Sequence, residues 1–382
     1  MTPGWQLVNF RRLVILANKP FVLLLLSDSE APHTRRWANW FAANGCEVHL
    51  ATFNSILDTG YRNVKIHVLW NQTRNSGLFW RSAKSLIILF RLIRLFLRIK
   101  PAVTHSHSTG AYSWSAFLLN LRPRIITPWG TDFLLDIHHS KLNFLLTKFS
   151  LKKANLVTTD AKHFLKDLES AGVNSDNLVY LAFGTDTTLF RKDRDSNPPR
   201  ATTIISTRTL NPVHQVEDLI MAIPLVIKMH PQVKFKIIGG GSDFNSLLKL
   251  VNDLGVNASV KFTGMLSEPE LISELCSSDI YVSTSPLDAG LAGSTAEAMS
   301  CELPVIHPNV ADNSKWVDQS GGVVYPVNDV VALADAINHL ITHPESWEQL
   351  GKRNRNKIVS ENNLDSNMSR MYEIYKTISG IS

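Results

Sequence analysis

The chain has 382 residues, more than a single hydrophobic core usually holds, so we expect two domains. Its hydrophobic content of 44% and its charged content of 19% are typical of a folded protein and argue against intrinsic disorder. The three cysteines, Cys46, Cys276 and Cys301, are far apart and form no C-x-x-C pair. This spacing argues against a disulfide framework and indicates a reducing compartment.

Charge is distributed unevenly along the chain. Residues 1–190 hold 22 Lys and Arg against 11 Asp and Glu, so the net charge of +6 conceals a basic first half and an acidic second half. No zinc-finger spacing or RNP-like aromatic motif accompanies the basic half, so we expect no nucleic-acid partner. An anionic membrane surface explains the excess more simply, because each Lys or Arg near such lipids contributes about 1 kcal/mol.

The opening 30 residues contain apolar runs that fit neither a signal peptide nor a membrane span. Arg11, Arg12, Lys19 and Pro20 interrupt these runs, and no small-residue cleavage site follows them. The run Phe21–Leu26 is too short to cross a bilayer. We therefore expect a fully buried parallel strand there.

Apolar strands alternate with helical stretches throughout the chain, which is typical of doubly wound parallel α/β sheets with helices on both faces. A polar, proline-bearing segment at 191–200 is a predicted linker between an N-terminal domain, 1–190, and a C-terminal domain, 201–365. A last helix over 366–382 is expected to pack back toward the N-terminal domain. The strands are predicted at Phe21–Ser27, Glu47–Thr52, Lys65–Leu69, Ala102–His105, Arg124–Thr127, Leu156–Thr159 and Leu178–Tyr180, and then at Thr202–Ser206, Lys234–Ile238, Val260–Phe262, Ile280–Ser283, Pro304–His307 and Gly322–Tyr325.

The stretch Leu78–Lys100 predicts a long helix with its basic residues on one stripe and apolar residues elsewhere. Two interpretations stay open. The helix could cover a sheet and leave a solvated basic edge, or it could lie on lipid, because its apolar arc is wide and its polar face is purely basic. A second basic run, residues 141–155, modestly favours the membrane. The basic stripe consists of Arg81, Lys84, Arg91, Arg94 and Arg98, at offsets of three, four and seven.

A glycine-rich loop precedes a helix start within Ser285–Ile306. Gly290 and Gly293 would let backbone N–H groups approach a ligand closely, and a helix that opens near Ser294 suits a phosphate. Glu297 would lie in the first turn and face the same site. The alternative is a capping box, because Ser294 and Glu297 have an S-x-x-E spacing that needs no ligand.

Seven segments together resemble the retaining GT-B glycosyltransferases that include glycosyltransferase family 4. They are HTRRWANWFAANGCEV, HSHS, PWGTD, GTDTTLF, IIGGGSD, FTGML and GSTAEAMSCELPVI, in the family's order along nearly the whole chain. The resemblance implies two Rossmann-like domains that face a central cleft, with the donor nucleotide on the C-terminal domain and the acceptor on the N-terminal one. It also implies transfer with retention at the anomeric carbon, no obligatory metal, and no cofactor besides the nucleotide-sugar substrate.

On the donor side, the resemblance assigns Glu297 to the second acidic residue of the Glu-x7-Glu motif, which holds the donor ribose. Ala289 stands in place of the first Glu, and Asp288 beside it could contact donor-sugar hydroxyls. Arg208 matches the family's diphosphate arginine, and His214 stands near the expected lysine, where it would be positive only when protonated. The predicted donor set is completed by Gly240, Gly241, Leu266, Gly290, Ser294 and Thr295.

On the acceptor side, His107 matches the family histidine that lies close to the transferred sugar. His105 alternates with it along the strand, and the alternative for either is a structural, hydrogen-bonded histidine. Gly130 and Asp132 belong to a family loop that borders the cleft. His33 and Arg35 follow the first strand, where many relatives carry a glycine-rich loop that this chain lacks.

The sequence therefore predicts a cytoplasmic enzyme, peripheral on the inner face of the cytoplasmic membrane. It would extend a lipid-linked or polysaccharide acceptor in cell-surface glycan biosynthesis. Two alternatives stay open. A GT-B sugar-nucleotide epimerase would turn over the donor without an acceptor, and a catalytically silent GT-B scaffold would explain the missing first Glu and the missing Lys.

Overall fold

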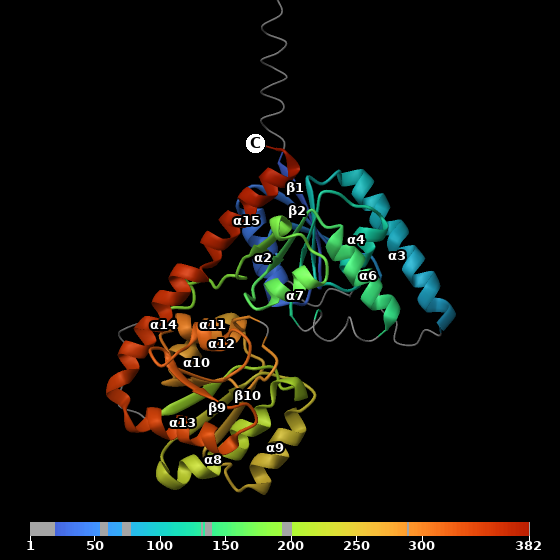
Figure 1. Ribbon diagram of the computed structural model, residues 1–382. Coiled ribbons are helices and arrows are strands. Elements are labelled where there is room, and N and C mark those ends of the chain that lie inside the picture. The colour runs from blue at the N-terminus through green and yellow to red at the C-terminus, as the bar shows by residue number, and fades with distance from the viewer. Residues whose placement is uncertain are drawn as a thin grey trace, which may run out of the picture. The chain divides into compact units, whose positions relative to one another are not determined.

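The computed structural model describes residues 20–53, 60–70, 78–130, 133, 140–192, 201–288 and 290–381, without the side chains of 78–83 (Figure 1). The chain folds into two compact units. The first comprises the chain up to Thr158 together with Leu168–Val179 and Met368–Ser382, and the second comprises Thr159–Asp167 and Tyr180–Asn367. Most of the predicted linker, residues 193–200, lies outside the described residues.

The first sheet has seven strands in the order β3-β2-β1-β4-β5-β6-β7. β1 pairs in parallel with both β2 and β4, so the strand order reverses at β1, as in other doubly wound sheets. The run predicted as a buried strand is β1, and helices cover both of its faces. The strands are β1 (Phe21–Leu26), β2 (Cys46–Thr52), β3 (Val64–Val68), β4 (Val103–His107), β5 (Arg124–Thr127), β6 (Leu156–Thr159) and β7 (Leu178–Tyr180).

Helices α2 and α15 lie on one face of this sheet, and α3 and α4 lie on the other (Figure 1). The ring of Phe41 in α2 lies 5.1 Å from that of Tyr375 in α15, and both side chains are buried. On the opposite face Leu92 of α3 packs in one cluster with Leu24 and Leu26 of β1. The helices are α2 (Pro32–Ala43), α3 (Leu78–Ile99), α4 (Ala111–Leu118), α6 (Lys141–Lys152), α7 (Phe164–Ser170) and α15 (Leu364–Ser379).

Helix α3 covers the sheet and also exposes apolar side chains. Leu92 is fully buried, whereas Leu86, Phe90 and Leu97, on the opposite side, are 69%, 64% and 63% exposed. The sheet-covering interpretation of this helix is therefore confirmed. Its outer side still exposes the apolar residues that suggested a contact with lipid. No helix among the described residues is both long and apolar enough to cross a membrane.

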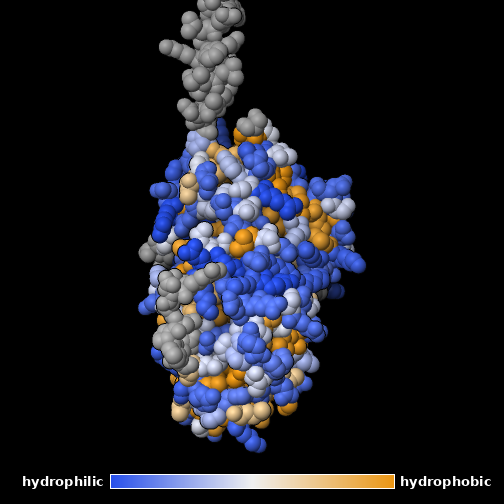
Figure 2. Space-filling view, turned by 90° about the vertical axis from the view of Figure 1, so that its left-hand side faces the viewer, coloured by the Kyte–Doolittle hydropathy of each residue, from blue (hydrophilic) through white to orange (hydrophobic). Residues whose placement is uncertain are grey.

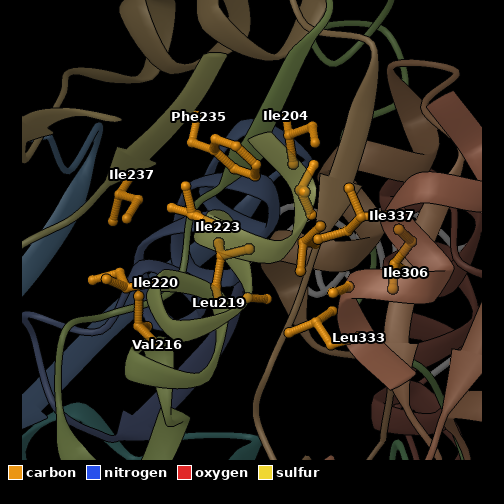
Figure 3. Close-up of a cluster of buried hydrophobic side chains, with 14 of the residues drawn as sticks. Ile204, Val216, Leu219, Ile220, Ile223, Phe235, Ile237, Ile306, Leu333 and Ile337 are labelled. Carbon is orange, nitrogen blue, oxygen red and sulfur yellow. The ribbon is translucent and has the colours of Figure 1, made fainter. Parts of the chain in front are cut away.

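The second sheet has six strands in the order β10-β9-β8-β11-β12-β13. A cluster of buried side chains joins one of its faces to α8 and α13, with Ile204 and Phe235 of the sheet against Leu219, Ile223 and Ile337 of the helices (Figure 3). The strands are β8 (Thr203–Ser206), β9 (Lys234–Ile238), β10 (Val260–Gly264), β11 (Ile280–Val282), β12 (Val305–Pro308) and β13 (Gly322–Tyr325).

The other face of the second sheet packs against α10, α11, α12 and α14, through buried residues such as Tyr281, Met299 and Ile358. α14 is mainly polar, and hydrophilic residues predominate on the face of the second unit on which it lies (Figure 2). The helices are α8 (Val216–Met229), α9 (Phe244–Asp253), α10 (Glu268–Cys276), α11 (Gly293–Ser300), α12 (Asn313–Trp316), α13 (Val330–Thr342) and α14 (Trp347–Glu361).

Every predicted strand is present, and the differences lie at the strand ends. β4 runs to His107 rather than stopping at His105, because Thr127 of the neighbouring β5 still pairs with His107. His107 is thus the last residue of a central strand. The three cysteines carry free thiols, and the fold brings Cys276 Sγ within 3.9 Å of Cys301 Sγ although the two are far apart along the chain.

Candidate functional site

Two loops of the second unit meet at the carboxyl ends of β8 and β11. These strands are neighbours in the sheet, although β8 ends at Ser206 and β11 begins only at Ile280. The first loop includes a short 3-10 helix, η3 (Pro212–His214), and the second precedes α11. The hydroxyl of Thr284 donates to the carbonyl of His214 at 2.8 Å and joins the loops. Ligands of open parallel sheets bind at this edge, so the predicted donor residues lie where a ligand is expected.

Arg208 is the central cation of this edge and is only 7% exposed. Its Nη2 donates to Asp288 Oδ1 at 2.6 Å, and its Nη1 donates to Ser294 Oγ at 3.2 Å. Asp288 is also buried, so the two form a buried ion pair. The sequence predicted separate roles for these residues and did not indicate their pairing, since nothing local relates positions 80 residues apart.

His214 accepts a hydrogen bond from Arg208 instead of carrying a charge. Its Nδ1 lies 3.0 Å from Arg208 Nη2 and 3.2 Å from Ser285 Oγ. Because a guanidinium only donates, Nδ1 must be unprotonated and the ring neutral. Burial, and then the charge of Arg208, lower the pKa of His214 to about 4. In this arrangement of the site His214 therefore carries no lysine-like charge, and its charge beside a donor diphosphate stays a prediction.

The start of α11 differs from the predicted capping box. The helix begins at Gly293, and its N-cap residue, Ala292, makes no side-chain hydrogen bond to it. Ser294 lies inside the first turn, where its hydroxyl is 3.0 Å from Tyr281 Oη and accepts from Arg208. The capping-box interpretation is wrong, because these partners occupy the Ser294 hydroxyl and the helix starts one residue earlier. A helix N-terminus without a capping side chain at its N-cap position favours an anion.

Glu297 and Thr295 are both buried on this short helix. Glu297 lies in the second turn and not in the first, since α11 begins at Gly293. The carboxylate thus stands one residue further from the helix start than the sequence predicted. Its distance along the helix from Ser294 is one turn, so both residues lie on the same side of α11.

The glycine run after β9 is explained by close packing of the backbone. Gly239 has φ +142°, and a Cβ there would lie 2.7 Å from the carbonyl oxygen of Arg208. A Cβ on Gly241 would overlap the carbonyl oxygen of Leu210. Glycine is therefore needed at both positions for packing, because it admits the loop that carries Arg208.

The remaining predicted donor positions lie around this loop. A Cβ on Gly240 would meet only the Met265 side chain, at 3.2 Å, and Leu266 is half-buried against the second sheet's core. A Cβ on Gly290 would lie 2.7 Å from Asp160 Oδ2, so Gly290 also serves packing. Ala289 lies outside the described residues.

In the first unit, His107 is 1% exposed, and neither of its ring nitrogens has a hydrogen-bond partner within the described part of the chain. Its ring packs at 4.9 Å from Trp37 and 5.6 Å from Trp129. Burial lowers its pKa to about 3, so the ring is neutral. A buried polar group without a partner is costly unless a ligand satisfies it, which favours a binding role.

His105 is the structural histidine of the pair. Its Nδ1 lies 2.6 Å from Tyr375 Oη, and its Nε2 lies 2.6 Å from Thr127 Oγ1. Both histidines are buried, because positions two apart on a strand share one face.

His33 stands in the first turn of α2, with its ring 6.3 Å from that of Trp129. Burial, and then the charge of Arg36, lower its pKa to about 4. Arg35 is half-buried on the same helix, and Gly130 is buried with φ +96°. Asp132 lies outside the described residues.

Three aromatic residues of these sites were missed as functional candidates from the sequence. Trp129 belongs to PWGTD and Trp37 to α2, but only the fold places their rings beside His107. Tyr281 lies in an ordinary strand pattern and gave no signal.

Comparisons with known proteins cover both units. Residues 190–357 match the family model described as glycosyl transferases group 1, and residues 22–161 match the model described as glycosyl transferase 4-like. The chain is 23% identical over 354 residues to N-acetyl-alpha-D-glucosaminyl L-malate synthase of Bacillus anthracis, with 87% of this chain and 90% of that protein covered. It is 26% identical over 217 residues to a GDP-mannose-dependent alpha-(1-6)-phosphatidylinositol monomannoside mannosyltransferase of Mycolicibacterium smegmatis, with 53% and 57% covered.

Solved structures share the fold. Sucrose-phosphate synthase from Thermosynechococcus elongatus superposes with a TM-score of 0.81 at 17% identity, covering 94% of this chain and all of that one. Anabaena Alr3699/HepE, solved in complex with UDP-glucose, superposes with a TM-score of 0.77 at 16% identity, covering 93% of this chain and 99% of that one.

Proposed function

Because this chain belongs to the group 1 glycosyltransferases and has their GT-B fold, we propose that it is a retaining, metal-independent hexosyltransferase. It takes a nucleotide-sugar donor on the second unit and a lipid-linked or polysaccharide acceptor on the first. No cofactor is required beyond the donor. The product belongs to cell-surface glycan biosynthesis.

The observation that carries this proposal is the buried Arg208 beside the uncapped start of α11. A fixed guanidinium and the positive end of the helix dipole of α11 stabilise the negative charge that develops on a leaving diphosphate. In the proposal, this arrangement provides the positive charge beside the leaving diphosphate that a bound Mg²⁺ would otherwise provide. Anabaena Alr3699/HepE, whose structures hold UDP and UDP-glucose, supports a nucleotide-sugar as the donor class.

Glu297 and His107 take complementary roles in the proposal. A carboxylate accepts two hydrogen bonds from a vicinal diol, which suits Glu297 to the donor ribose. The neutral ring of His107 has one donor and one acceptor nitrogen for hydroxyl groups near the transferred sugar.

Replacing Glu297 with Gln tests the donor assignment. The amide keeps the shape of the side chain but loses the charged acceptor, so we expect affinity for the matching nucleotide-sugar to fall about tenfold or more while the protein still folds. Calorimetric titration with UDP- and GDP-sugars measures the affinity, and thermal unfolding checks the fold. An unchanged affinity in the variant would exclude Glu297 from the ribose site.

Release of free UDP or GDP separates the proposed transferase from its alternatives. The transferase should release nucleotide only when an acceptor lipid or glycan is added. An epimerase would turn over the donor without an acceptor, and a silent scaffold would bind the donor without turnover under any acceptor. Either of these last outcomes overturns the proposed reaction.

His214 should contribute no pH dependence to donor binding near neutrality. Its pKa of about 4 lies below the value of about 6.5 for a free histidine, so the neutral ring stabilises the fold above about pH 6.5, and this contribution is lost as pH falls toward 4. We expect UDP-glucose or GDP-mannose affinity to stay constant between about pH 6.5 and 8.5. If donor affinity instead weakens steadily as pH rises through 6.5, and this weakening disappears in His214→Gln, then His214 binds the donor as a charged residue.

The acceptor is proposed to reach the enzyme at a membrane surface. The relative from Mycolicibacterium smegmatis is named for a phosphatidylinositol mannoside acceptor, which is a lipid. On this chain the exposed apolar side chains of α3 alternate with exposed Arg94 and Arg98, and α6 repeats the combination with Phe149 and Lys152. Basic residues beside apolar ones favour an anionic bilayer, so we place the enzyme peripherally on the inner face of the cytoplasmic membrane.

Replacing Arg94 and Arg98 with Gln should weaken binding to vesicles that contain phosphatidylglycerol. Arg91 is kept, because its Nη1 donates to the Leu69 carbonyl at 2.9 Å and supports the fold. Binding of the unmodified protein should also weaken as salt rises, since exposed charges are screened beyond about 10 Å at 0.1 M. Sedimentation with vesicles measures both effects.

A matched control uses exposed apolar residues of the second unit. Replacing Phe90 and Leu97 with Ser should reduce vesicle binding, whereas replacing Leu225 and Met229 of α8 with Ser should not, although all four are exposed. Equal losses in the two variants would remove α3 from the membrane contact.

A further inference from the structure

The ion pair between Arg208 and Asp288 is incomplete. A guanidinium and a carboxylate usually form two parallel hydrogen bonds, but here only Arg208 Nη2 bonds Asp288 Oδ1. Arg208 Nε and Asp288 Oδ2 are both buried and have no hydrogen-bond partner among the residues that the structure describes. A buried pair that leaves one donor and one acceptor unsatisfied has room for a better set of partners.

The hydrogen-bond partners of the Arg208 guanidinium show which residue a bound phosphate must displace. Both bidentate edges of a guanidinium include Nη2, paired either with Nε or with Nη1. The two hydrogens of Nη2 are already directed at Asp288 Oδ1, at 2.6 Å, and at His214 Nδ1, at 3.0 Å. An incoming diphosphate can therefore bind Arg208 through two bonds only if one of these partners leaves.

Asp288 is the partner that a diphosphate displaces most readily. His214 is neutral and tolerates a nearby phosphate, whereas the carboxylate of Asp288 repels one. Asp288 also stands in the loop before Gly290 and α11, at the same edge of the sheet. Once released from Arg208, its carboxylate requires hydrogen-bond donors, and sugar hydroxyls are such donors.

We propose that Asp288 is a displaceable counter-ion of Arg208. Before the donor binds, the Asp288 carboxylate neutralises the guanidinium. When the donor diphosphate binds Arg208, Asp288 leaves the guanidinium and accepts hydrogen bonds from hydroxyls of the donor sugar. The inference rests on the proposed nucleotide-sugar donor. With an intact nucleotide-sugar, the released carboxylate gains hydroxyl partners. With a bare nucleoside diphosphate it gains none and opposes the added negative charge. Asp288 therefore favours the nucleotide-sugar over the nucleoside diphosphate and promotes release of the latter after transfer.

The test compares the affinities of UDP, GDP, UDP-glucose and GDP-mannose for the unmodified protein and for Asp288→Asn, by calorimetry at pH 8. The amide still accepts from Arg208 but carries no charge. We expect the variant to bind the matching nucleoside diphosphate about tenfold more tightly, while affinity for the nucleotide-sugar stays level or falls. Asp288→Glu, which restores the charge, should bring the ratio of the two affinities back toward that of the unmodified protein.

Asp312→Asn is the matched control. It removes one charge from another buried, ion-paired carboxylate of the second unit, which bonds Lys315 and the backbone of His163 instead. This control should leave both affinities unchanged. If Asp288→Asn does not fold, as thermal unfolding would show, the comparison is made with Asp288→Ser, which also removes the charge.

The possible results separate the inference from the proposed function. If the unmodified protein binds none of the four nucleotides, the proposed donor class is wrong and the inference falls with it. If the unmodified protein binds them, but removal of the Asp288 charge does not raise the affinity for the nucleoside diphosphate, only the counter-ion role is overturned. A purely structural Asp288 would change both affinities by the same factor, which also overturns it.

Discussion

Replacing Arg208 with Met should abolish donor binding and lower the free energy of unfolding by about 3–5 kcal/mol. The pair with Asp288 is buried, and removal of one partner leaves the other charge without compensation. The same change removes the proposed contact to the diphosphate. Chemical denaturation measures the stability, and titration with nucleotide-sugars measures the binding.

Two further variants separate these effects. Arg208→Met combined with Asp288→Asn should recover part of the lost stability, because no unpaired charge remains, but should not recover donor binding. Arg355→Met removes a part-buried arginine that donates to backbone carbonyls of Phe190 and Ser300 in the same unit. It should lower stability and keep donor affinity. Donor binding at full affinity in Arg208→Met would show that Arg208 does not contact the diphosphate.

Replacing Gly241 with Ala should lower the free energy of unfolding by about 3 kcal/mol or more and weaken donor binding with it. The added Cβ would overlap the carbonyl oxygen of Leu210. That carbonyl cannot move freely, because it accepts from the N–H of Asp243 at 2.9 Å, and the N–H of Leu210 donates to Gly240 at 3.0 Å. Relief of the overlap must therefore shift the loop that carries Arg208.

The adjacent Gly240 provides the control. A Cβ there meets only the side chain of Met265, which is 77% exposed and free to move away. Gly240→Ala should change the free energy of unfolding by less than about 1 kcal/mol. Thermal and chemical unfolding measure the stability of both variants. Equal losses of stability in Gly240→Ala and Gly241→Ala would contradict the packing explanation of these glycines.

The sequence by itself determined the strands and the edge of the sheet at which the candidate residues lie. Phe21–Leu26 is a continuous apolar run, and such a run is buried on both faces wherever helices cover a parallel sheet. The alternation of strands and helices then placed Arg208, His214 and Glu297 after strands or at a helix start. These inferences succeeded because the periodicity of a strand or helix depends on neighbours within a few residues.

Only the tertiary structure decided which side chains became partners. β8 and β11 are adjacent in the sheet, so Arg208 meets Asp288 and Ser294 across about 80 residues of chain. Because the strands are adjacent, the Ser294 hydroxyl accepts a hydrogen bond from Arg208 and does not form the predicted cap. The packing of the first unit likewise distinguished His105, which is bonded at both nitrogens, from His107, which is not. Local patterns carry no information on such choices, because a hydrogen bond depends on the distance and direction between groups that only the packed sheets bring together.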